Sequence, residues 1–263
     1  MRRQLLLFAL ALAAAWPARA AWTDCPRIVS QSPYITRALQ WMGLERCIVG
    51  VSVYDALDRP RTGGVMVPDA TAIAALAPQL MITADWTDAA RWQAPPGAVA
   101  LRVDGFHGMA DAEAMLRRVG RAAGVADIDA RVERFDADWR QAVAGIHGGR
   151  RRVLLMTACD GAPYSYGRGT TLHDLFTRAG FRVVAGHEGI RSFGGDTEAL
   201  RRWLAARHPD IVFAFKDHAD TACSLALLRP GTRIVRLDND RFIHPGPGLL
   251  DGLAQLREAL SEP

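Results

Sequence analysis

The chain has 263 residues and a formal net charge of +4 at pH 7. Three of its arginines, Arg2, Arg3 and Arg19, lie in a leader that we expect to be removed, so the working protein carries a charge of about +1. This near-neutral charge argues against a nucleic-acid partner. After the leader, the sequence has no apolar run of the roughly 20 residues that a membrane-spanning helix needs.

Residues 1–20 are typical of a cleavable secretory signal peptide. Arg2 and Arg3 form its charged start, residues 5–15 form its apolar run, and residues 18–20, with the small Ala18 and Ala20, form its cleavage site. We therefore expect a mature chain that begins near Ala21. It should be a soluble, monomeric protein of the bacterial periplasm.

The first half of the mature chain predicts a small α/β lobe. Gly43 ends the first helix, as glycine commonly does. Pro78 ends the second helix and directs the chain into an apolar strand of the buried, parallel kind. The predicted strands lie at residues 27–31, 48–53, 80–83 and 99–103, and the predicted helices at 34–42 and 69–76.

One long amphipathic helix is predicted over residues 127–146. Apolar residues recur there at steps of three and four, with acidic residues and arginines between them, and two glycines at 148–149 end the pattern. Such a helix between two lobes would limit how far they close on each other. The alternative is an ordinary surface helix of one large domain.

The second half repeats the α/β order of the first. Residues 73–83 and 204–214 each run from a short helix through a proline, Pro78 or Pro209, into an apolar strand. The predicted fold class is therefore α/β with two Rossmann-like lobes, at 21–125 and 149–263, joined by a single long helix at 126–148 and enclosing a cleft. The second lobe should have strands at 153–157, 181–184, 211–215 and 233–237, and helices at 172–179, 197–206, 219–227 and 249–260.

Four cysteines in an oxidising compartment allow two disulfides. Cys25 and Cys47 each precede a predicted strand, and a strand–helix–strand unit places the starts of its two parallel strands side by side. We therefore pair these two. Cys159 and Cys223 both follow strands of the second half and would form the other disulfide, with two buried free thiols as the alternative.

Aromatic side chains gather where the predicted strands end. Ligands of open parallel sheets bind at the carboxyl ends of the strands, and all four tyrosines of the chain lie in the loops there. Flat amphipathic rings suit a large, flat, partly apolar ligand. The candidate ligand-binding residues are Tyr34, Tyr54, Asp55, Trp86, Phe106, Tyr164, Tyr166, Arg168, Arg191, Phe193 and Lys216.

The histidines do not show the spacing of a strong metal site. Solvated loop positions explain most of them, while His107, His187 or His218 could be an axial ligand to a bound metal complex. Metal-dependent hydrolysis is the enzyme alternative, using His187, Glu188, Asp217 and His218. Because the hydrolase, phosphate-loop and dinucleotide motifs are missing from the sequence, we expect a binding protein without a cofactor.

With these pieces placed, the chain resembles the periplasmic solute-binding proteins of ABC importers for iron complexes, haem and vitamin B12, the class III family. The resemblance covers most of the mature chain. It rests on the two helix–proline–strand junctions and on residues 27–36 (RIVSQSPYIT), 42–51 (MGLERCIVGV), 167–176 (GRGTTLHDLF), 179–180 (AG) and 244–248 (HPGPG).

The resemblance implies capture of a metal chelate between the lobes and its delivery to an ABC permease in the inner membrane. An aromatic cleft suits a corrinoid or haem, and we favour a corrinoid or a related chelate. An anionic ferric siderophore would instead need a cluster of cations such as Arg59, Arg168, Arg191 and Lys216.

The permease contact is the least regular part of the resemblance. Many family members dock through an exposed glutamate near the start of the helix before each proline junction. Thr71 and Arg202 occupy those positions here, with Asp69 and Glu198 nearby. A periplasmic carrier or sensor of the same fold, without the standard permease contact, is therefore the alternative.

Overall fold

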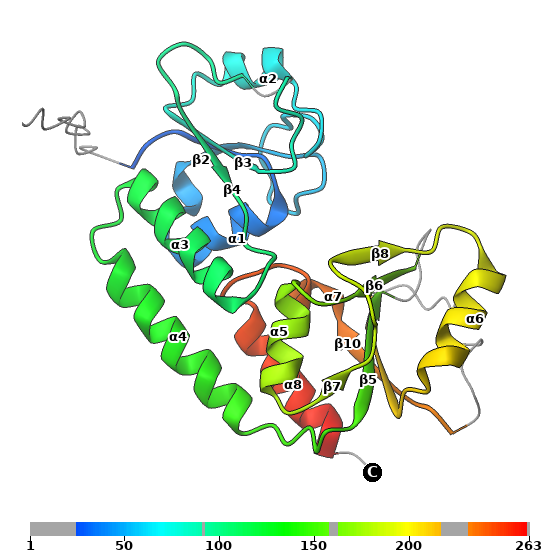
Figure 1. The fold of residues 1–263 in the computed structure, drawn as a ribbon. Helices are drawn as coiled ribbons and strands as arrows, with labels where there is room; N and C mark the ends of the chain where they lie inside the picture. The colour runs from blue at the N-terminus through cyan, green and yellow to red at the C-terminus, as the bar shows by residue number, and fades with distance from the viewer. Residues whose placement is uncertain (1–24, 91–92, 158–162, 217–230, 262–263) are drawn as a thin grey trace, which may run out of the picture.

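The computed structural model describes residues 25–90, 93–157, 163–216 and 231–261. Two sheets, each covered by helices, form two lobes that lie one above the other in Figure 1. The α/β, two-lobe prediction is confirmed. Residues 1–20, where we expect a signal peptide, lie outside the described residues. Within the described ranges, every helix is too short or too polar to cross a membrane.

The N-terminal lobe contains a parallel sheet in the order β2-β1-β3-β4. The two central strands are buried along their whole length because helices or loops cover both faces. Each strand agrees with the sequence prediction to within two residues at either end. The elements are β1 (Ile28–Ser30), α1 (Pro33–Trp41), a 3₁₀ turn (Glu45–Cys47), β2 (Ile48–Val51), α2 (Ala70–Ala75), β3 (Leu80–Ala84), β4 (Val99–Val103) and α3 (Met109–Ala123).

The disulfide predicted between Cys25 and Cys47 is confirmed. The two residues lie before the parallel strands β1 and β2, and their Cα atoms are 5.8 Å apart. The second predicted pair, Cys159 and Cys223, lies outside the described residues.

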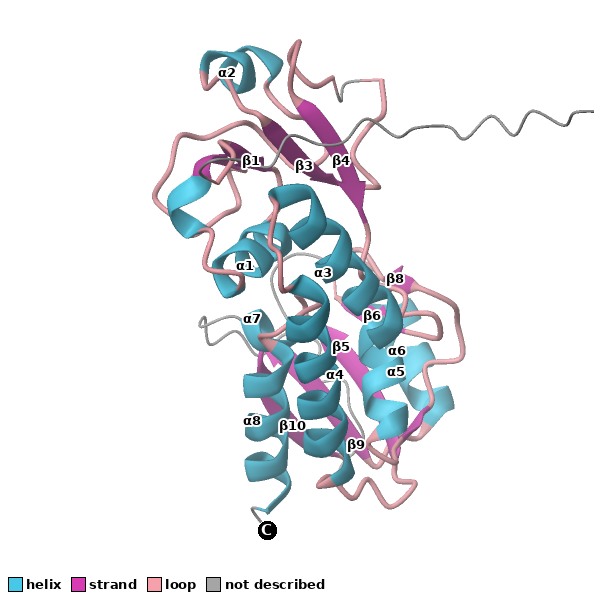
Figure 2. Cartoon of the chain, turned by 90° about the vertical axis from the view of Figure 1, so that its left-hand side faces the viewer, coloured by secondary structure: helices cyan, strands magenta, loops and turns pink. Residues whose placement is uncertain are grey.

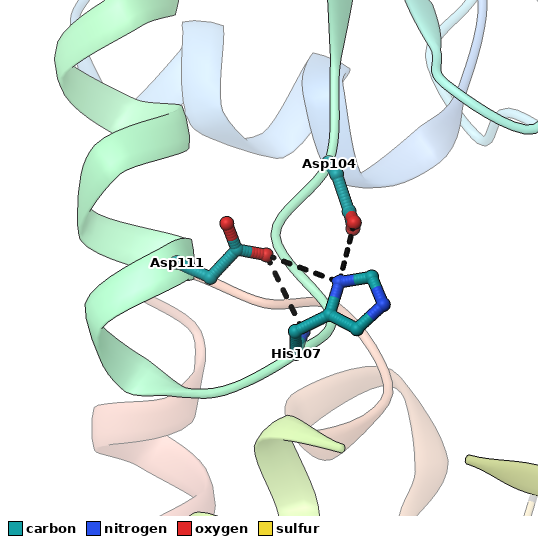
Figure 3. A group of neighbouring side chains, drawn as sticks. All are labelled: Asp104, His107 and Asp111. Carbon is teal, nitrogen blue, oxygen red and sulfur yellow. Dashed lines mark hydrogen bonds and ion pairs between the residues drawn. The ribbon is translucent and has the colours of Figure 1, made fainter. Parts of the chain in front are cut away.

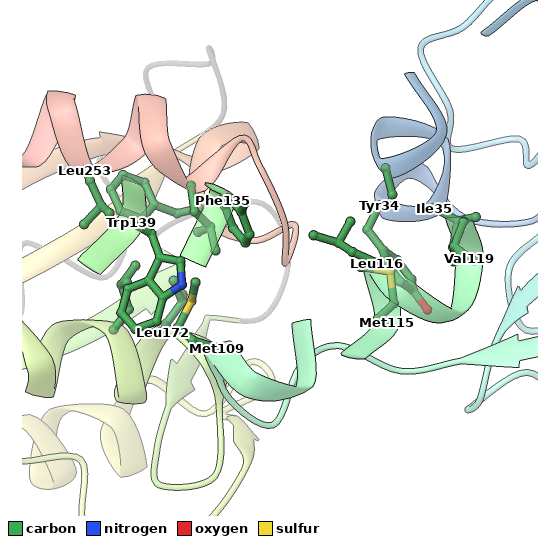
Figure 4. Close-up of a cluster of buried hydrophobic side chains, with 14 of the residues drawn as sticks. Tyr34, Ile35, Met109, Met115, Leu116, Val119, Phe135, Trp139, Leu172 and Leu253 are labelled. Atoms are coloured by element: carbon green, nitrogen blue, oxygen red, sulfur yellow. The ribbon is translucent and has the colours of Figure 1, made fainter. Parts of the chain in front are cut away.

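Helix α3 was missed by the sequence analysis. It packs against α1, α4 and α5 and so joins both lobes. A Cβ atom at Gly120 would clash with the side chain of Ile128, so this glycine permits the close approach of α3 to the next helix. Figure 4 shows Met109, at the start of α3, near Trp139 and Leu172, while Val119 lies near Ile35 of the N-terminal lobe. One continuous hydrophobic core therefore runs through both lobes.

Helix α4 (Ile128–Ala144) is the predicted long helix, and in Figure 1 it runs from the side of the N-terminal lobe down along the C-terminal lobe. Its buried residues include Val132, Phe135 and Trp139, which follow the predicted spacing. In Figure 2, α4 and α8 (Leu249–Ser261) lie side by side over one face of the C-terminal sheet.

The C-terminal lobe has a mixed sheet in the order β10-β9-β5-β6-β8, with β7 paired to β5. The parallel core is as predicted, whereas β6, β8 and α7 were not predicted. The helix expected at 219–227 lies outside the described residues. The further elements are β5 (Arg152–Thr157), β6 (Tyr164–Tyr166), α5 (Thr171–Arg178), β7 (Arg182–Val183), β8 (Ile190–Ser192), α6 (Thr197–Arg207), β9 (Ile211–Lys216), β10 (Arg233–Asp238) and α7 (Asn239–Phe242).

The two proline junctions have the same backbone conformation. Ala77 and His208, each the residue before the proline, have φ values of 42° and 44°. The strand after each junction lies between two parallel neighbours, β3 between β1 and β4, and β9 between β5 and β10. The repeat predicted from the sequence is thus a repeat in three dimensions.

Candidate ligand-binding cleft

A cavity of about 720 Å³ lies between the lobes. This volume is within the range of about 300–1,000 Å³ that is common for small-molecule and cofactor sites. The N-terminal lobe contributes Asp85, Trp86, Asp104, Phe106 and His107. The C-terminal lobe contributes Tyr166, residues 168–172, residues 188–190, Phe242, Ile243 and Pro245.

The N-terminal wall is built where β3 and β4 end. Trp86 follows β3 and Phe106 follows β4, and both side chains line the cavity at the carboxyl ends of these strands. Their ring centroids are 4.9 Å apart in an edge-to-face arrangement, a favoured geometry for aromatic pairs. Trp86 remains 41% exposed, so its ring is available to a ligand.

Tyr34 lies behind this wall and is 2% exposed. Its ring centroid is 5.7 Å from that of Trp86 and 5.0 Å from that of Phe106. Its hydroxyl donates a hydrogen bond of 2.8 Å to the carbonyl oxygen of Val103. Burial, together with the nearby Asp104 and Asp85 charges, raises the pKa of Tyr34 far above its ordinary value. Tyr34 therefore supports the two cleft rings as a neutral phenol.

The C-terminal wall meets the N-terminal wall at the start of α5. The Thr171 backbone N–H donates to the carbonyl oxygen of Phe106 at 2.7 Å, and its hydroxyl donates to that of Gly105 at 2.9 Å. Tyr166, at the end of β6, packs edge-on against Phe215. Arg168 pairs with Glu188 at 2.7 Å, and both residues line the cavity.

Several predicted site residues lie away from the cavity. Tyr54 and Tyr164 are 71% and 41% exposed and do not line it. Asp55 accepts a hydrogen bond of 2.7 Å from the Thr36 hydroxyl, and burial raises the pKa of its carboxyl. It belongs to the interior of the N-terminal lobe.

Phe193 and Arg191 also lie outside the cavity lining. Phe193 is 8% exposed and packs on Trp203 with 4.8 Å between ring centroids. The Arg191 guanidinium lies 5.1 Å from the Phe193 ring centroid. Lys216 ends β9, and its side chain, like Asp217 and His218, lies outside the described part of the chain.

Among the described residues that line the cavity, His107 is the histidine. Its Nδ1 lies 2.5 Å from an Asp104 carboxylate oxygen and 3.6 Å from one of Asp111. Figure 3 shows Nε2 pointing away from both carboxylates. The donor atoms of these three residues all lie within 4.8 Å of one another, close enough to hold a metal ion.

His187 is held differently. Its Nε2 lies 3.2 Å from the Ser165 hydroxyl, and its Nδ1 lies 3.2 Å from the carbonyl oxygen of Glu188. Both ring nitrogens are engaged within the protein, and the residue does not line the cavity. To coordinate a metal, His187 would have to give up one of these two contacts.

Part of the cavity lining was not predicted from the sequence. Asp85 and Asp104 directly follow β3 and β4, so their position at strand ends was a signal that could have identified them. Ile190 and Phe242 come from β8 and α7, which were not predicted, and the sequence carries no signal that places them at the cleft.

No protein-family model and no curated protein matches the sequence. Among solved structures, the chain is similar to the periplasmic heme-binding protein BhuT in complex with two hemes, with a TM-score of 0.72 and 22% identity over 90% of this chain and 98% of that one. It is similar to the periplasmic heme-binding protein HutB of Vibrio cholerae, with a TM-score of 0.72 and 15% identity over 89% and 98%. A periplasmic heme-binding protein from Pseudomonas aeruginosa gives a TM-score of 0.63 and 24% identity over 90% and 92%.

These similarities, with the two lobes and the long helix already described, define the fold. It is the fold of the class III periplasmic solute-binding proteins of ABC importers.

Proposed function

We propose that the protein is the periplasmic binding component of an ABC importer and that it captures haem, or a closely related planar metal chelate, in the cleft between its lobes. In this proposal residues 21–125 and 149–263 close on the ligand, and residues 126–148 form the rigid connection. The mature protein works as a monomer in the periplasm.

The apolar faces of the cleft carry this proposal. Trp86 and Phe106 line one wall, and Ile190 and Phe242 line the other. Aromatic side chains bury roughly 150–250 Å² each when covered, so these walls favour a flat ligand with two large apolar faces. The solved structures described above are named as heme-binding proteins, which supports haem ahead of the corrinoid favoured by the sequence analysis.

His107 is the proposed axial ligand to the iron. Asp104 accepts from Nδ1 and so fixes the tautomer that leaves Nε2 free to coordinate a metal. Arg168, at the opposite wall, is placed to pair with a carboxylate of the ligand. Haem carboxylates would compete there with Glu188.

Titration with haemin, cyanocobalamin and a ferric siderophore, followed by tryptophan emission, tests the proposal. Haemin should quench the tryptophan emission at ratios of up to one haemin per protein. Trp86→Phe should remove much of the quenching, whereas Trp41→Phe, on α1 and outside the cavity, should leave it. Quenching by none of the three ligands would overturn the proposal.

A bare divalent transition-metal ion is the second candidate, because Asp104, His107 and Asp111 could hold one together. A bare metal ion would use Asp111 as a ligand, whereas haem would not. Asp111→Asn should weaken binding of zinc or manganese and leave haemin binding nearly unchanged, whereas His107→Ala should weaken both. Thermal unfolding with zinc chloride or manganese chloride, against magnesium chloride as control, measures the first effect.

The proposed partner is an inner-membrane permease, and the two carboxylates near the expected docking positions make contacts within the chain. Asp69 caps α2 by accepting from the backbone N–H groups of Thr71 and Ala72 at 3.0 Å. Glu198 pairs with Arg201 at 2.7 Å and lies 3.6 Å from Arg202. This engagement supports the carrier or sensor as the alternative, and recovery of a permease by the immobilised protein from detergent-solubilised inner membrane would decide against it.

A further inference from the structure

A second cavity, of about 430 Å³, lies in the C-terminal lobe, and four arginines contribute to its lining. It is formed by the start of β5, the loop before α5 with the first turn of that helix, β7 with the residues after it, and the end of α6. Its charged and titratable lining consists of Arg152, Arg168, His173, Arg182 and Arg207. Among the described residues that line it, none is acidic.

Two of these guanidinium groups are fixed by backbone carbonyls. Arg152 donates from Nε to the carbonyl oxygen of His208 at 3.0 Å and from Nη2 to that of Arg207. Arg207 donates from Nε to the carbonyl oxygen of Ala185 at 2.8 Å and also lies over the Trp203 ring at 4.5 Å. A guanidinium has five N–H donors, so each keeps donors for another partner. Their positions are set before any ligand arrives, which lowers the entropy lost on binding.

The positive charge of this cavity is not neutralised within the described part of the chain. Arg152, Arg182 and Arg207 form no ion pair with a described carboxylate, and only Arg168 has one, with Glu188. Burial, and then the nearby charge of Arg191, lowers the pKa of Arg207. Burial, and then the charge of Arg168, likewise lowers the pKa of His173. An anion in the cavity would offset these costs.

We propose that this cavity binds a small anion with two or more negative charges, either a phosphate or a polycarboxylate. Planar, forked guanidinium groups recognise both through paired hydrogen bonds. The inference does not rest on haem binding, although Arg168 lines both cavities and would link their occupancy.

Thermal unfolding of the mature, haem-free protein tests the site. Inorganic phosphate and citrate, each compared with sodium chloride at equal ionic strength, should raise Tm through preferential binding to the folded state. A rise in Tm with only one of the two anions supports the site and identifies whether its ligand is a phosphate or a polycarboxylate. No rise beyond that of sodium chloride with either anion would overturn it.

A matched pair of variants locates the effect. Arg182 is exposed and lines the cavity, whereas Arg236 is an exposed arginine of β10 outside it. Arg182→Gln should raise the apparent Kd for the effective anion about tenfold, the loss of one charge-assisted hydrogen bond, and Arg236→Gln should leave it unchanged. An equal change in both variants would mean general charge screening and would contradict the proposal.

Discussion

Arg27 and Arg152 occupy equivalent positions in the two lobes. The Arg27 guanidinium donates to the carbonyl oxygen of Leu76 at 2.7 Å and that of Ala77 at 3.4 Å, at the end of α2. The Arg152 guanidinium donates to the corresponding carbonyls at the end of α6, those of Arg207 and His208. Each arginine therefore stabilises the last turn of the helix before its proline junction.

The backbone of each arginine makes a matching contact. The Arg27 N–H donates to the side-chain oxygen of Gln79 at 2.9 Å, and the Arg152 N–H donates to the carboxylate of Asp210 at 2.7 Å. Gln79 and Asp210 both follow the junction prolines. The amide of Gln79 thus replaces a carboxylate without loss of the hydrogen bond.

Replacement of Ala77 by glycine should stabilise the protein. The φ of 42° is costly for a residue with a Cβ atom and free for glycine, although glycine loses more entropy on folding. We expect Ala77→Gly to raise the free energy of unfolding by up to about 1 kcal/mol. Ala74→Gly, within α2, should lower it by about 0.5–1 kcal/mol. Urea unfolding measures both, and a loss of stability in both variants would contradict the strain at Ala77.

Removal of the disulfide should cost about 3 kcal/mol, because it closes a loop with a sequence separation of 22. We expect this loss when Cys25 and Cys47 are both replaced by serine. The measurement is the midpoint of urea unfolding without reductant. An unchanged midpoint would mean that this disulfide does not constrain the unfolded chain.

His244 should make the protein less stable in acid. Burial, and then the charge of Arg37, lowers its pKa from the ordinary 6.5 to about 4, while Asp240, 3.9 Å away, acts in the opposite direction. The unfolded chain therefore binds a proton more readily, so stability decreases as the pH falls from 6.5 towards 4, by about 3 kcal/mol in total. His244→Gln should flatten this dependence.

Loss of the Tyr34 hydroxyl should affect stability more than ligand binding. Tyr34→Phe removes one of two hydrogen bonds to the carbonyl oxygen of Val103, which still accepts from the Asp85 backbone N–H at 3.0 Å, and should cost about 0.5–1.5 kcal/mol. The rings of Trp86 and Phe106 keep their support, so the affinity for haemin should change less than threefold. A large loss of affinity would mean that the Tyr34 hydroxyl itself reaches the ligand.

The spacing of apolar residues in the sequence predicted more of the fold than of the ligand-binding cleft. Pro78 and Pro209 interrupt helices and precede apolar strands, and these local signals predicted both junctions. Helix α3 has apolar residues at helical spacing, such as Met109, Leu116 and Val119, but its many alanines and Gly120 weaken the pattern. Glycine is needed at position 120 because Ile128 packs against it, and no local sequence pattern reveals this contact.

The cleft depended on contacts between distant segments. Strand ends predicted Trp86 and Phe106, because sequence alone says where a strand stops. It does not say which aromatic side chains turn inward, so Tyr34 was expected at the ligand and lies behind the wall instead. Phe242 reaches the cavity only because α7 lies beneath the cleft, which depends on the fold of the whole C-terminal lobe.

The affinity for haemin, measured from the change in its visible absorption, tests the central claim most directly. The wild-type mature protein should bind haemin, and Phe106→Ala should weaken binding about ten- to a hundredfold, the loss of roughly 1.5–3 kcal/mol of ring contact. Tyr164→Ala, an aromatic position outside the cavity, should bind like the wild type. Absence of haemin binding, or equal losses in the two variants, would contradict the account.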